Sequence, residues 1–167
     1  MRCARLNRRK GDSRLGLLEL ELQATILRPT LLEAKRALSS LDEGFRSLSS
    51  LPDESSKVPR MFLVAITKDS EVRLSMGQTR FLIRDAEQGN VYPRWFQGAY
   101  ESAMDGVPRK SRRELAELAE DGGLLDRIVS VRNPVAHSLT PVDLQSLQDD
   151  VFKALGIVAS GRRGEAT

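Results

Sequence analysis

The sequence predicts an all-α fold, a bundle of helices within one domain. Apolar residues recur at helical spacing near the N-terminus and again in the run Leu124–Val131. Two Ser/Thr-x-x-Glu patterns are typical of capping boxes, which open helices. No internal repeat or low-complexity tract divides the 167 residues. We therefore expect one helical domain over residues 14–159, with flexible segments at 1–13 and 160–167.

Two helices are expected in the first third of the chain. Four apolar residues indicate a helix that ends at Pro29: Leu15, Leu18, Leu22 and Ile26. Thr30 and Glu33 form a capping-box pattern, which predicts a second helix from Thr30 through Leu48. Residues 51–59 are rich in proline, serine, aspartate and lysine, so they are expected to form a loop.

The middle of the chain leaves one alternative open. Residues 61–76 suit a helix entered at Pro59, which we favour, or a short hairpin of two strands joined near residues 68–70. A helix is predicted at Phe81–Glu87, with turns at residues 89–93 and 104–108. Trp95, Phe96 and Tyr100 are expected to pack in the core or an interface, rather than to line a cofactor pocket.

The last third gives the clearest helical pattern. Ser111 and Glu114 form the second capping-box pattern, for a helix that ends at Gly122-Gly123. The apolar run Leu124–Val131 predicts a helix that leads into Arg132. Thr140 and Pro141 suit the N-cap and first position of a final helix. Its inward side would carry Leu144, Leu147, Val151 and Leu155.

Composition and charge favour a protein of the cytoplasm with an anionic partner. The net charge is +3 and the single cysteine, Cys3, has no disulfide partner. No apolar run is long enough to cross a bilayer, and the basic start lacks the apolar segment of a secretory signal. A basic cluster is a candidate to bind RNA phosphates, or it is simply a solvated charged face: Arg109, Lys110, Arg112 and Arg113. Arg127 is a further candidate to bind RNA phosphates.

The hexapeptide Arg-Asn-Pro-Val-Ala-His, residues 132–137, joins the last two predicted helices. Asn133 precedes a proline, which disfavours the α conformation, so we expect Asn133 to end one helix and cap a new turn starting at Pro134. On one straight helix, Arg132 and His137 would point about 140° apart. With the break, both can face one cleft near a helix N-terminus, which favours an anion such as phosphate. Alternatively, the segment is only a helix junction with a structural histidine.

The hexapeptide resembles the R-N-x-x-x-H motif of the HEPN superfamily, whose members are small helical bundles and in many cases endoribonucleases. With its flanks, Leu124 to Asp143, it is most similar to the HEPN domains of the CRISPR type III ancillary CARF–HEPN ribonucleases. The resemblance implies a HEPN-type helical bundle, a homodimer with one shared active site, and Arg132, Asn133 and His137 as catalytic residues. This chain lacks a CARF-like α/β region, so a sensor domain would lie outside it.

The expected activity is metal-independent cleavage of single-stranded RNA to 2′,3′-cyclic phosphate and 5′-OH ends, in CRISPR-linked or other antiviral defence. No metal or other cofactor is expected, because RNA supplies its own nucleophile in the 2′-OH and the sequence lacks the usual metal-ligand spacings. His137 would act as general acid or base, and Arg132 would stabilise the charged transition state. Two alternatives remain: a non-catalytic HEPN module that binds RNA or protein, and a toxin neutralised by an antitoxin outside this chain. Leu139 stands where the toxins usually have tyrosine, which disfavours the toxin.

Overall fold

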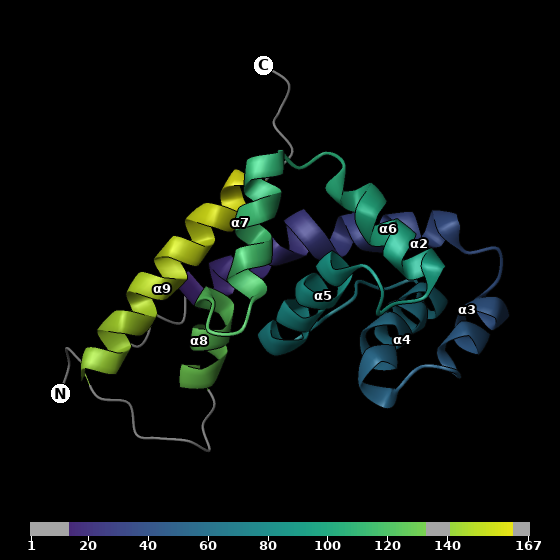
Figure 1. Cartoon of the computed structure of the whole chain (residues 1–167), viewed down its shortest axis with the longest axis horizontal. Helices are drawn as coiled ribbons and strands as arrows, with labels where there is room; N and C mark the ends of the chain where they lie inside the picture. The colour runs from purple at the N-terminus through teal and green to yellow at the C-terminus, as the bar shows by residue number, and fades with distance from the viewer. Residues whose placement is uncertain (1–13, 133–140, 162–167) are drawn as a thin grey trace.

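The computed structural model describes residues 14–132 and 141–161, and every regular element in these two ranges is helical (Figure 1). The prediction of an all-α fold is therefore confirmed. A helix over residues 14–22 is followed by η1 (Gln23–Leu27), α2 (Arg28–Ala37), α3 (Leu41–Leu48), α4 (Asp53–Lys68), α5 (Met76–Gln88), α6 (Arg94–Met104), α7 (Arg109–Ala119), α8 (Leu124–Arg132) and α9 (Pro141–Ser160). The alternative hairpin at residues 61–76 is wrong, because α4 continues to Lys68 and residues 69–75 form a connecting segment without strand pairing.

The first helix does not end at Pro29, contrary to the sequence prediction. Residues 14–37 are helical throughout, and η1 is a π-helical segment just before the proline. The wider π-turn moves the preceding carbonyls away from the proline ring, which removes the clash that an α-helix would impose. Thr30 is therefore not an N-cap, and its Oγ1 donates to the Ile26 carbonyl at 2.6 Å. The chain breaks instead at residues 38–40, where Ser40 caps α3 by accepting from the Glu43 N–H.

The predicted loop at residues 51–59 is also wrong over most of its length. Helix α4 begins at Asp53, so Pro59 lies inside it and is buried. The proline removes one backbone hydrogen bond, but neighbouring Val58 and Phe62 are buried, and their burial offsets that loss. Helix α3 packs closely on α4, because Gly44 leaves room for the Leu63 side chain.

Two further helix starts differ in detail from the sequence prediction. Ser111 is inside α7 rather than at its N-cap, because Pro108 ends the preceding turn and α7 starts at Arg109. The Ser111 hydroxyl is buried and donates to the Ser160 carbonyl at 3.1 Å. A capping box does form where none was predicted, at Ser75 and Gln78 before α5.

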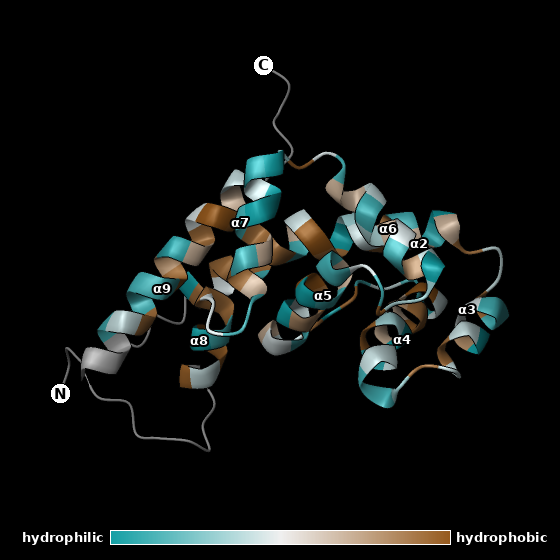
Figure 2. Cartoon of the chain, viewed as in Figure 1, coloured by the Kyte–Doolittle hydropathy of each residue, from teal (hydrophilic) through white to brown (hydrophobic). Residues whose placement is uncertain are grey.

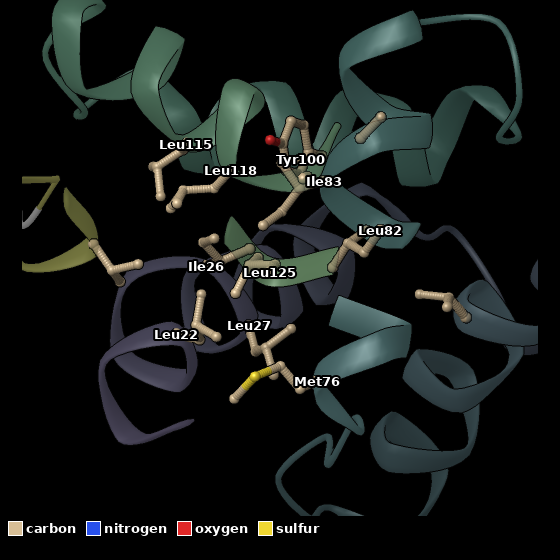
Figure 3. Close-up of a cluster of buried hydrophobic side chains, with 14 of the residues drawn as sticks. Leu22, Ile26, Leu27, Met76, Leu82, Ile83, Tyr100, Leu115, Leu118 and Leu125 are labelled. Carbon is tan, nitrogen blue, oxygen red and sulfur yellow. The ribbon is translucent and has the colours of Figure 1, made fainter. Parts of the chain in front are cut away.

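The main apolar core of the described residues lies between the long N-terminal helix and the helices that cover it (Figures 2 and 3). Leu22 and Ile26 from the N-terminal helix face Leu115 and Leu118 of α7 and Leu125 of α8. At the α3–α4 end, Phe96 packs edge-to-face on three aromatic rings, with centroid distances of 4.9, 4.9 and 5.5 Å: Phe62, Tyr92 and Trp95. The predicted packing role of Trp95, Phe96 and Tyr100 is confirmed.

Candidate functional site

Helix α8 carries the described start of the hexapeptide and is held on several sides. Leu125 and Ile128 are fully buried, and the helix packs on α5, α7 and α9. Its first turn is fixed by Asp126, whose carboxylate accepts from the Gly122 N–H at 2.8 Å. Arg80 of α5, itself buried, forms ion pairs with Asp121 at 2.5 Å and Asp126 at 3.7 Å. The position of α8 therefore follows from core packing and from a buried arginine.

Helices α8 and α9 pack against each other at the end of the molecule opposite α3 and α4 (Figure 1). Arg127 of α8 pairs with Asp150 of α9 at 3.3 Å. The C-terminal end of α8 carries the negative end of its helix dipole. The N-terminal end of α9, at Pro141, has backbone N–H groups without intrahelical acceptors.

The structure describes only part of the predicted catalytic set. Arg132 is the last described residue of α8, and its backbone is helical. Asn133 and His137 lie outside the described residues, as do the predicted break at Asn133 and the N-cap Thr140. Pro141 is the first described residue of α9, as predicted for the final helix. The catalytic roles of Arg132, Asn133 and His137 stay predictions.

The predicted RNA-binding residues fall into two places. Arg127 is one and a half turns before Arg132 on α8 and is half-exposed. Arg109, Lys110 and Arg113 are exposed on the first two turns of α7. The bond from Ser111 to Ser160 puts this part of α7 beside the C-terminal end of α9. Because the 20 residues of α9 span about 30 Å, the α7 cluster is separated from the N-terminal end of α9 by roughly the length of that helix.

Arg112, the fourth member of that cluster, is bound within the protein. Its Nε donates to Glu87 at 3.0 Å and its Nη2 donates to Glu101 at 2.7 Å. Burial lowers the pKa of Arg112, but the hydrogen bonds to Glu101 and Glu87 outweigh that effect and raise it overall. Tyr100 also donates to Glu87, at 3.0 Å, and burial, followed by the Glu87 charge, raises the pKa of this tyrosine. Arg112 thus joins α5, α6 and α7 through two carboxylates.

Sequence reasoning missed the partners that position α8. Asp150 pairs with Arg127, 23 positions away in the chain, and Arg80 pairs with Asp121, 41 positions away. No local sequence pattern indicates pairs that are so far apart. The Ser75–Gln78 box does have a local signal, the S-x-x-Q spacing before an apolar segment. Within residues 14–132 and 141–161, no three acidic, histidine or cysteine side chains are grouped as metal ligands. In the same ranges, no helix has the length and hydropathy needed to span a membrane.

No model of a known protein family matches the chain, and neither the curated proteins nor the solved structures gave a match.

Proposed function

We propose that this protein is a metal-independent endoribonuclease of the HEPN type, which acts as a homodimer on single-stranded RNA in the cytoplasm. The observation that supports the proposal best is the arrangement of α8 and α9. These two helices pack against each other at one end of the molecule (Figure 1), and the hexapeptide 132–137 lies between them in the sequence. The R-N-x-x-x-H pattern therefore begins at a helix end that the core holds in place.

The proposed chemistry uses the 2′-OH of RNA as the nucleophile. His137 would take the proton from that hydroxyl or give one to the departing 5′-oxygen. Arg132 would stabilise the negative charge that develops on the phosphorus oxygens, and Asn133 would position the phosphate. One imidazole cannot serve as base and acid in the same step, so the mechanism calls for a second copy of the motif across a two-fold interface.

The arrangement of cations also bears on how RNA would lie. Arg127 lies five residues before Arg132 on α8, about 140° around the helix, so it would contact the strand from another side of α8, and Asp150 competes for its guanidinium. Arg109, Lys110 and Arg113, about a helix length away, would contact a distant part of the strand. Arg112 would have to give up Glu87 or Glu101 before it could bind a phosphate.

A cleavage assay in EDTA tests the proposal directly. The purified protein and its Arg132→Ala and His137→Ala variants would be incubated with a labelled single-stranded RNA and with DNA of the same sequence. Loss of a positioned acid or base costs about 10²–10⁴-fold in rate, so His137→Ala should nearly abolish cleavage. Arg132→Ala should also be severely impaired. Arg94→Ala is the matched control, because Arg94 is exposed at the start of α6, distant from α8.

The products and the assembly state complete the test. The RNA products should carry 2′,3′-cyclic phosphate and 5′-OH ends, and DNA should be inert. Light scattering should show a dimer at micromolar concentration, and mixed dimers with one His137→Ala chain should keep little activity. EDTA-sensitive cleavage, cleavage of DNA, or a fully active His137→Ala protein would show that the hexapeptide is only a helix junction.

A further inference from the structure

A basic groove runs along α4, which lies at the end of the molecule opposite α9, and it reaches Gln78 near the start of α5 (Figure 1). It has a volume of about 490 Å³ and lies between one face of α4 and the segment that follows this helix. Its apolar lining comes from Met61, Val64, Ala65 and Val72. Val64 is 38% exposed and Met61 is half-buried, so part of this apolar surface meets water. We call this feature the α4 groove.

Positive charge surrounds the α4 groove. Four exposed cations line it: Lys57, Arg60, Lys68 and Arg73. None of the four forms an ion pair or side-chain hydrogen bond with another of the described residues. The one carboxylate in the lining, Glu71, is paired with Arg28 at 2.9 Å. The groove therefore presents apolar surface beside four positive charges with no negative charge to balance them.

This combination favours an acidic amphipathic partner over RNA. Single-stranded RNA is usually held by aromatic side chains that stack on its bases, and the lining of the α4 groove contains no aromatic residue. Aliphatic side chains are instead the surface that leucine or isoleucine from a partner would bury. Carboxylates beside those apolar residues would then meet the lysines and arginines at the edges.

We propose that the α4 groove is the docking site for an acidic amphipathic helix of a partner protein. The lining residues of α4 run from Lys57 to Lys68, a span of about 16 Å at the helical rise. A partner helix of about three turns matches this length. Its apolar residues would recur every three or four positions and contact Met61 and Val64, with glutamate or aspartate on either side.

Fluorescence anisotropy with a synthetic peptide tests the proposal. The probe is a capped, labelled peptide of about four turns, with leucines at helical spacing and glutamates at the flanking positions. It should bind, and more weakly as salt increases, because the ion pairs are exposed. The double variant Lys57→Glu/Lys68→Glu should lose about tenfold or more in affinity, since each exposed charge pair contributes modestly and reversal adds repulsion.

A matched control separates the groove from net charge. Arg46→Glu/Arg94→Glu changes the net charge by the same amount at exposed positions outside the lining, and it should bind the peptide like the unmodified protein. A peptide with lysines in place of the glutamates should bind the Lys57→Glu/Lys68→Glu variant better than the unmodified protein. Circular dichroism would verify that both double variants keep their helical content.

Three outcomes would overturn the proposal. The first is no binding of the acidic peptide, and the second is equal binding of a peptide whose leucines are replaced by serine. The third is tight binding of a labelled oligouridylate that Lys57→Glu/Lys68→Glu abolishes, which would make the groove an RNA site. The RNA measurement uses His137→Ala protein, so that cleavage does not interfere. The peptide measurement and the ribonuclease assay use separate ligands and separate variants, so peptide binding and ribonuclease activity can each fail independently.

Discussion

Gly123 controls how α8 leaves the turn after α7, and Gly123→Ala should be clearly destabilising. An added Cβ would lie 2.6 Å from the Glu117 carbonyl oxygen, 2.7 Å from that of Leu118 and 2.9 Å from that of Glu120. Ordinary carbon–oxygen contacts are about 3.3 Å or longer, so the backbone would have to shift by roughly 0.5 Å or more. All three obstacles are backbone atoms, which cannot move aside as a flexible side chain can.

The size of the effect follows from two opposing contributions. Overpacking of this kind typically costs about 1–3 kcal/mol. Alanine also restricts the unfolded chain more than glycine, which returns roughly 0.4–1 kcal/mol. The shift would further disturb the hydrogen bonds from Gly123 N–H to Glu120 and from Arg127 N–H to Gly123, at 2.9 and 3.0 Å. We expect a net loss of about 2 kcal/mol, which lowers the Tm of a chain this size by roughly 4–8 °C.

Urea and thermal unfolding, followed by far-UV circular dichroism, would measure this loss. Gly98→Ala is the matched control, because Gly98 is inside α6 and an added Cβ there meets nothing within 4 Å. It should be neutral or stabilise by about 0.5–1 kcal/mol, since alanine is the better helix former. A Gly123→Ala protein as stable as the unmodified one would refute the reasoning, because it would mean that the turn between α7 and α8 tolerates a side chain.

Two further predictions concern the core. Phe96→Ala should lower the free energy of unfolding in urea by about 3–5 kcal/mol, because Phe96 is fully buried among three aromatic rings. The control Phe152→Ala, at a residue that is 65% exposed, should change the free energy of unfolding by about 0.5 kcal/mol or less. Equal losses in the two variants would contradict the packing described. Burial raises the pKa of Tyr92 and Tyr100 above the ordinary 10.0, so the folded protein keeps phenolic protons that the unfolded chain loses. The stability that the two neutral phenols contribute is fully present below pH 10 and is lost as the pH rises further. Above pH 10 the midpoint of unfolding should therefore decrease with pH, and it should decrease less steeply in Tyr92→Phe. An identical pH profile for Tyr92→Phe would refute the assignment to Tyr92.

Local sequence patterns were sufficient to predict a helix where the residues at its own ends determine its boundaries. The apolar run Leu124–Val131 predicts α8 almost residue for residue, and Gly89 ends α5 in the left-handed conformation that glycine adopts without strain. Pro29 and Pro59 misled the prediction, because each proline is inside a helix that tertiary packing stabilises. Helix propensity describes the cost of such a residue, whereas the burial that offsets it, as at Val58 and Phe62, depends on packing against other helices.

The candidate site likewise has residues that a local motif indicates and features that depend on tertiary packing. Arg132, Asn133 and His137 are close in sequence, so a motif could indicate them. The position of the α7 cations at the C-terminal end of α9 depends on how α7 packs beside α9, which no local pattern reveals. The α4 groove was hidden for a different reason. Lys57 falls in the predicted loop, and only its place in α4 aligns it with Arg60 and Lys68 on one face.

The π-helical segment η1 determines where the N-terminal helix can change in length. It places one extra residue in a turn between residues 14–22 and α2, and its Thr25, Ile26 and Leu27 are all buried. Deleting that extra residue would restore an ordinary α-helical turn and keep the flanking helix faces in register, whereas deleting one residue from α2 would turn everything before it by about 100° around the helix axis. Leu18 and Leu22, both buried now, would then rotate out of the core. Changes in length should therefore be excluded from the α-helical parts of this helix during evolution, and homologues of this protein should differ in the spacing between Leu22 and Pro29 by at most the one extra residue of η1.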